Sequence, residues 1–114
     1  MGVGLTVIVE EVDGKCVMRI TGRIDAATTP ILEKKVEDEV QQGHIRIVFD
    51  FSGVDYLSSA GMRLLLSATK KMKVKEGMLT NCGMVDEVME IIKMAGFERI
   101  LNIYSTEKEA LDAL

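Results

Sequence analysis

Two adjacent serines, Ser58 and Ser59, follow a hydrophobic segment and precede a segment with the apolar spacing of a helix. A hydroxyl at this place can accept a hydrogen bond from the free amides of the first helical turn, as helix caps do. The same amides and the positive end of the helix dipole also stabilise an anion. A phosphate on either hydroxyl is therefore compatible with the fold, and it adds about −1.5 to −2 charges. The residues permit both interpretations, a structural cap and a modification site.

The elements that must position the serines can be predicted from the apolar periodicity. The first twenty residues alternate apolar and polar positions on both sides of Asp13-Gly14, which predicts a hairpin with a tight turn, and residues 1–6 lead into its first strand. A helix is expected to begin near Thr29-Pro30, with Thr29 as its cap, and to end at Gly43. The run Ile45–Phe51 is typical of a central strand that is covered on both faces.

Further elements follow towards the C-terminus. Residues 52–57 are expected to form a loop, and a helix is expected over 59–74. The remaining segments predict a strand over 78–82, a helix over 85–95, a strand over 100–104 and a final helix after a capping box at 106–109. The order predicts an α/β fold with an N-terminal hairpin, a mostly parallel sheet and about four helices.

Length and composition limit the number of domains and the classes of function. The 114 residues suit one domain over 1–114, and 47% hydrophobic with 28% charged residues is an ordinary globular balance. The net charge of −4 argues against a nucleic-acid partner. No apolar run is long enough to span a bilayer, and no secretion signal is evident, so we expect a cytoplasmic protein. Cys16 and Cys82 have apolar neighbours and are expected to be buried, reduced thiols.

Residues for catalysis or metal binding are sparse. The chain lacks a phosphate-binding glycine loop and a dinucleotide fingerprint, and no His, Cys or Asp cluster has metal-ligand spacing, so we expect no cofactor, no metal and no enzymatic activity. His44, the one imidazole, is expected at a strand edge without a carboxylate or a nucleophile nearby. Asp50 could imitate the acceptor of a phospho-receiver domain, but no acidic pair follows a first parallel strand. It is expected to be satisfied by local amides.

The segment Asp50–Arg63 resembles the signature of the STAS domain, the family of bacterial anti-sigma factor antagonists. The segment Gly22-Arg23-Ile24-Asp25 resembles the Gly-x-hydrophobic-Asp loop that follows the hairpin in that family. The resemblance extends over nearly the whole chain, and the predicted element order agrees with it. In the family the acceptor of an Asp-Ser-Ser/Thr-Gly motif is the serine directly after the Asp. Alignment on Gly61 therefore places Ser59 at the acceptor position, and Ser58 at the position that the Asp occupies in the family motif.

The resemblance implies a regulatory binding protein. An unphosphorylated member binds an anti-sigma factor that is also a Ser/Thr kinase, and so frees the sigma factor. The kinase then phosphorylates the loop serine and releases the antagonist, and a Ser/Thr phosphatase resets it. Here this implies phosphorylation at Ser59, with Ser58 as the alternative. Ala60 replaces the second hydroxyl residue of the motif, as in the Ser-Ser-Ala-Gly variant that many members resemble.

We expect the partner to contact the serine loop and a second loop at the same pole of the sheet. Arg63 lies one turn into the helix, where it could reach a partner or a phosphate, or could simply be solvated. The predicted contact residues are Asp25, Thr28, Ser58, Ser59, Gly61, Met62 and Arg63. The alternative function keeps the fold and changes the role, to a scaffold or accessory subunit of a transporter or of a stressosome-like assembly, without phosphorylation.

Overall fold

Alternating strands and helices follow an N-terminal hairpin over residues 4–114, which are the residues that the computed structural model describes. Of the lead-in expected over residues 1–6, Met1–Val3 lie outside them, and Leu5 and Thr6 already belong to the first strand. The elements are β1 Leu5–Val12, β2 Lys15–Ile24, α1 Thr29–Gln41, β3 Arg46–Leu57, α2 Ser59–Val74, β4 Met78–Cys82, α3 Asp86–Ala95, β5 Ile103–Tyr104 and α4 Glu107–Asp112. This order confirms the predicted α/β fold, with five strands and four helices in the described part of the chain.

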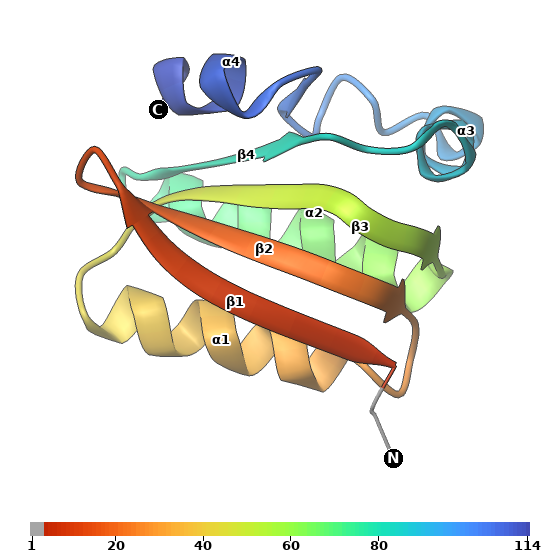
Figure 1. Cartoon of the computed structure of the whole chain (residues 1–114), viewed down its shortest axis with the longest axis horizontal. Coiled ribbons are helices and arrows are strands. Elements are labelled where there is room, and N and C mark those ends of the chain that lie inside the picture. The colour runs from red at the N-terminus through yellow and green to blue at the C-terminus, as the bar shows by residue number, and fades with distance from the viewer. Residues whose placement is uncertain (1–3) are drawn as a thin grey trace.

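The sheet has the order β1-β2-β3-β4-β5. β1 pairs with β2 in antiparallel register, and β2, β3, β4 and β5 are all parallel. Each crossover advances one strand in the same direction. Because such crossovers are right-handed, α1, α2 and α3 are placed on one face of the sheet. Figure 1 shows the strands side by side, with α2 behind them and with the β2–α1 and β3–α2 junctions at the same end of the sheet.

Two apolar layers hold the sheet. The larger one joins β2 and β3 to the first three helices, and its fully buried members include Phe49, Leu32, Leu65 and Ile92. The smaller one lies on the opposite face, under α4, and comprises Val17, Val48, Cys82 and Ala110. β3 is thus covered on both faces over its first half, as its continuous apolar run predicts.

β3 is longer than the sequence predicts. Residues 52–57 belong to the strand and not to a loop, because β2 also continues and pairs with them as far as Ile24↔Leu57. β3 carries one extra residue at each of two register shifts, opposite Arg19–Thr21 and Gly22–Arg23. These bulges break the alternation from which a strand is predicted, and bulges of this kind also increase the local twist. A Cβ at Gly53 would lie 2.8 Å from Thr21 Oγ1 and 3.0 Å from the carbonyl oxygen of Ile20, so glycine favours this close approach of the two strands.

Two smaller predictions were wrong. The last strand covers only Ile103–Tyr104, because the preceding residues turn back on Phe97 through hydrogen bonds from the amides of Ile100 and Leu101. The cap residue of α1 is Thr28 and not Thr29, and its hydroxyl makes no capping hydrogen bond. Pro30 does lie in the first turn, as expected.

The two thiols are free and buried, as predicted. Burial raises the pKa of Cys16 to about 12 and that of Cys82 to about 11, so both are protonated at neutral pH. Within residues 4–114, no helix combines the length and the hydrophobicity that a membrane crossing requires.

Candidate functional site

The β3–α2 junction, which carries the two serines, and the loop after β2 meet at the carboxyl ends of two neighbouring parallel strands. Ile24 and Leu57 are register partners at the ends of β2 and β3. The next residue, Ser58, donates its backbone N–H to the carbonyl oxygen of Ile24 at 2.9 Å. The start of α2 is therefore fixed to the end of β2 by a backbone hydrogen bond, and both junctions lie at the same end of the sheet (Figure 1).

The two serines have different environments. Ser58 is the N-cap of α2, and its Oγ accepts the amide N–H of Gly61 at 3.2 Å. Its carbonyl oxygen also accepts the amide of Met62 at 2.9 Å. Ser59 is the first residue of the helix and is exposed. Its hydroxyl takes part in none of the side-chain hydrogen bonds among residues 4–114. One serine thus serves as the cap, and the other presents its hydroxyl outward.

Gly61 is required by packing beneath the serines. A Cβ at this position would lie 2.6 Å from Leu57 Cδ1 and 2.7 Å from Ile24 Cγ2. Both neighbours are almost completely buried, at 1% and 0% exposure. The first turn of α2 can therefore approach the ends of β2 and β3 only without a side chain here. Met62 is also buried, at 6% exposure, and packs in the main core.

Asp25 and Thr28 form a closed turn in the neighbouring loop. Asp25 Oδ1 accepts the amides of Ala27 at 3.0 Å and Thr28 at 3.1 Å. The Thr28 hydroxyl donates to the carbonyl oxygen of Arg23 at 2.8 Å and accepts the Asp25 amide at 2.9 Å. Thr28 is 5% exposed, whereas Asp25 is half-buried. Thr28, like Gly61 and Met62, therefore offers little surface of its own and shapes the site from below.

Two cations lie in this part of the molecule. The Arg23 guanidinium lies 4.2 Å from the ring centroid of Tyr56, its register partner on β3, and its Nε is 3.9 Å from Asp25 Oδ2. The sequence did not single out this stack, because only the extension of β3 brings the two residues together. Arg63 is exposed and forms none of the ion pairs among residues 4–114. It follows Ser59 by four positions, which places both on the same side of the helix.

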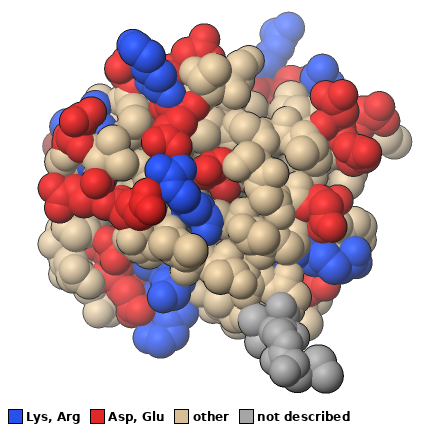
Figure 2. Space-filling view, in the orientation of Figure 1, with Lys and Arg blue, Asp and Glu red and all other residues tan. Residues whose placement is uncertain are grey.

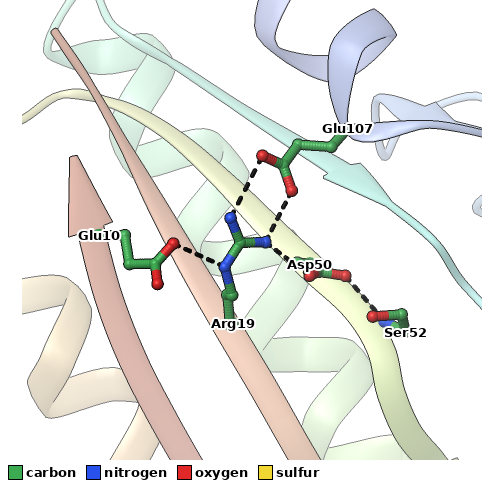
Figure 3. A network of polar contacts seen from close by, with 5 residues as sticks. All are labelled: Glu10, Arg19, Asp50, Ser52 and Glu107. Atoms are coloured by element: carbon green, nitrogen blue, oxygen red, sulfur yellow. Dashed lines mark hydrogen bonds and ion pairs between the residues drawn. The ribbon is translucent and has the colours of Figure 1, made fainter. Parts of the chain in front are cut away.

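An ion network stabilises the sheet on the face that α4 covers, opposite α1, α2 and α3 (Figure 3). Arg19 on β2 contacts Glu10 at 2.8 Å, Asp50 at 3.0 Å and Glu107 at 2.7 Å, so it links β1, β3 and α4. The hydrogen bond to Glu107 contributes most to a raised pKa of Arg19, and those to Glu10 and Asp50 raise it further. Burial favours the neutral acid of Asp50, but hydrogen bonds from Ser52 and Arg19 outweigh it and lower the pKa. Asp50 accepts the Ser52 amide, as predicted, and pairs with Arg19.

Another part of this face is uncharged. Figure 2 shows a broad area without charged side chains over the part of the sheet where β2 and β3 approach their carboxyl ends. Outward residues of β1, β2 and β3 here include Thr6, Ile8, Thr21 and Ser52, all of them exposed. Ile8 alone is a large apolar residue, at 55% exposure.

His44 has a carboxylate partner, contrary to the prediction. Its Nδ1 lies 2.6 Å from Glu39 Oε1, and the same oxygen is 3.7 Å from the Cys16 sulfur. The contact arises because the chain turns back after α1, where the His44 amide donates to the carbonyl oxygen of Glu39. Among residues 4–114, no group of three His, Cys, Asp or Glu side chains has the arrangement of a metal site.

The family follows from comparison of the whole chain with known proteins. The STAS domain model matches residues 6–110. The chain belongs to the STAS domain family. It is 28% identical over 109 residues to the anti-sigma-F factor antagonist RsfB of Mycobacterium tuberculosis, and the alignment covers 94% of this chain and 87% of the relative. The resemblance predicted from the serine loop is thereby confirmed.

Solved structures agree with this assignment. The crystal structure of an anti-sigma factor antagonist from Mycobacterium paratuberculosis superposes with a TM-score of 0.86 at 29% identity, over 96% of this chain and 92% of that one. The Bacillus protein SpoIIAA shares the fold at 20% identity, with TM-scores of 0.78 for its unphosphorylated and 0.71 for its phosphorylated form. Those alignments cover 95% of this chain and 95% and 98% of the SpoIIAA chains.

Proposed function

We propose that this STAS domain is an anti-sigma factor antagonist that is switched by phosphorylation of Ser59. It binds an anti-sigma factor with Ser/Thr kinase activity, loses affinity when the kinase modifies Ser59, and regains it when a Ser/Thr phosphatase removes the phosphate. The role is that of a binding protein and not of an enzyme. Relatives named anti-sigma factor antagonists support the partner class, and a protein of the same fold is known in a phosphorylated form.

The different environments of the two serines carry the proposal. A kinase needs an accessible hydroxyl, and Ser59 is exposed without a hydrogen bond to its hydroxyl among the described residues. Ser58 is half-buried, and its Oγ already accepts the amide N–H of Gly61. Accessibility therefore favours Ser59 over Ser58 as the acceptor.

The partner surface consists of an exposed part and a supporting part. Ser59, Arg63 and the outer edge of Asp25 are available for contact. Thr28, Gly61 and Met62 are buried and fix the positions of the two loops. Ser58 belongs to both parts, since it is half-buried and caps the helix.

The switch acts through local charge. A phosphate on Ser59 adds about −1.5 to −2 charges at a helix N-terminus, where free amides and the helix dipole stabilise it. Arg63, four residues further along, provides a second favourable contact. In the complex the same phosphate would face the phosphates of the kinase-bound nucleotide, and each 1.4 kcal/mol of repulsion weakens binding about tenfold. Affinity therefore changes while the fold is retained.

The proposal is tested by incubating the purified chain with ATP and an extract of the source cells, followed by mass spectrometry. The expected result is one phosphate, on Ser59, which is lost in Ser59→Ala. Ser67→Ala is the matched control, because Ser67 is an exposed serine further along the same helix, and it should remain a substrate. A phosphate on Ser58, or an unmodified chain, would contradict the proposal. The unmodified result would favour the unphosphorylated scaffold role.

A further inference from the structure

A pocket of about 590 Å³ lies beside the carboxyl-terminal half of α2, between this helix, the start of β4 and the segment that follows α3. Its volume is within the range of small-molecule sites, roughly 300–1,000 Å³. The pocket is separate from Ser59. Its basic residues, Lys70 and Lys73, are 11 and 14 positions further along α2, or roughly 16–21 Å along the helix axis.

The pocket exists because the last strand is short. β5 pairs only with Asn81 and Cys82, so within residues 4–114 no strand lies beside the first residues of β4 on the edge opposite β3. Instead, the Asn102 side-chain amide donates to the carbonyl oxygen of Leu79 at 3.0 Å. The turn after α3 brings Phe97 and Ile100 to the pocket wall, and Ile100 is left 55% exposed. An apolar ligand that covers exposed apolar surface of this kind removes it from water, and this lowers the free energy of the complex.

Two lysines supply the charge at this pocket. Leu66, Lys70 and Lys73 recur at helical spacing and all contribute to its wall. Neither Lys70 nor Lys73 takes part in an ion pair anywhere in residues 4–114. Four lysines fall within residues 70–75 of a chain whose net charge is −4. An unpaired basic pair beside an apolar hollow is complementary to a ligand with one anionic end.

We propose that this pocket binds a small, free amphiphile with an apolar body and one anionic head group, of which a medium-chain carboxylate is the simplest example. The apolar body lies against Leu66, Phe97 and Ile100, and the carboxylate lies between the ammonium groups of Lys70 and Lys73. Charge-assisted hydrogen bonds from two ammonium groups give the head group its specificity. The recess suits a single free molecule better than the flat surface of a membrane. This site does not depend on the proposed function of Ser59.

The test is an NMR titration of the full chain with decanoate below its micelle concentration. The amides of residues 66–73, 77–79 and 97–102 should shift, and decyltrimethylammonium, with the same tail and the opposite charge, should produce no saturable shifts there. Lys70→Gln/Lys73→Gln should weaken decanoate binding about tenfold, which corresponds to about 1.4 kcal/mol. The matched variant Lys71→Gln/Lys75→Gln removes the same charge from the end of α2 and its C-cap, outside the pocket wall, and should weaken binding less than about twofold.

Several results would overturn the proposal. These are a lack of decanoate binding, equal binding of the cationic analogue, shifts that centre elsewhere, or equal losses in the two double-lysine variants. Vesicles of anionic lipid form the last comparison. If they bind the chain and free decanoate does not, the basic surface recognises membranes and the pocket proposal is wrong.

Discussion

The backbone amide of Ser58 donates a 2.9 Å hydrogen bond to the carbonyl oxygen of Ile24. This bond joins the residue before α2 to the last residue of β2, two segments that are far apart in the sequence. The position of the neighbouring Ser59 is therefore set by backbone contacts and by packing under Gly61, and not by its own side chain. We therefore expect that this hydroxyl can be modified without a change in the structure that presents it.

Alanine replacements should separate the two serines. Ser58→Ala removes the cap that holds the Gly61 amide, and it should lower the free energy of unfolding by about 1 kcal/mol. Ser59→Ala removes a solvent-exposed hydroxyl and should change it by less than about 0.5 kcal/mol. Urea denaturation of both variants measures the difference. Equal losses, or a larger loss for Ser59→Ala, would mean that Ser59 also has a structural role.

Gly61→Ala should destabilise the domain although alanine is the better helix former. The added methyl group would lie 2.6 Å from Leu57 Cδ1 and 2.7 Å from Ile24 Cγ2, so the start of α2 must move. We expect a net loss of about 1–2 kcal/mol, which is typical of overpacking. Without the steric conflict the substitution would stabilise the helix by about 1 kcal/mol. Thermal unfolding gives the sign, and a raised Tm would show that the contact at Gly61 is looser than described.

An acidic residue at position 59 should leave the fold intact. Ser59→Asp places a negative charge at the first residue of α2, where the helix dipole contributes about 0.3–1 kcal/mol in its favour. The Tm should therefore stay within a few degrees of the parent, or rise, and the gain should shrink in high salt. Combination with Arg63→Gln tests the second contact and should reduce any gain. A Tm lowered by ten degrees or more would mean that charge at this site acts through unfolding.

Acid should weaken the fold through the network around Arg19. The pKa of Asp50 is lowered in the folded chain, so its ionised form contributes stability above its unfolded pKa of about 3.9. This contribution is lost as the pH falls through the lower, folded value. In Asp50→Asn, the free energy of unfolding should therefore decline less steeply below about pH 4 than in the parent. Asp55→Asn, an exposed substitution outside the ion pairs of residues 4–114, should keep the parent slope.

Much of the fold could be predicted from local patterns. The hairpin, the helices and the central strand each have apolar spacing that agrees with their local turn and cap residues, and such agreement makes a prediction safe. Residues 52–57 lack this agreement. Their Ser-Gly and Asp residues are typical of a turn, yet β2 holds them in a bulged strand through pairing that is distant in sequence. Pairing of this kind leaves no local signal.

The site could be predicted in outline only. The serines were found because a strand, a short connection and a helix start are local features, and the family resemblance then distinguished Ser59 from Ser58. The burial of Thr28 and Met62 depends on how the loops fold back on the core. The Arg23–Tyr56 stack depends on the register of β2 and β3. The lysine-lined pocket arises from the shortness of β5, which the sequence predicted as a longer strand.

The most direct test compares the chain carrying phosphoserine at position 59 with the unmodified chain. Both forms are used to capture the proposed partner, an anti-sigma factor with kinase activity, from an extract of the source cells, and both are recorded by NMR. The account predicts at least tenfold weaker capture by the phosphorylated form, with amide shifts confined to residues 25–28 and 58–63. Equal capture by the two forms, or shifts that spread through the sheet, would contradict a switch that changes affinity while the fold is retained.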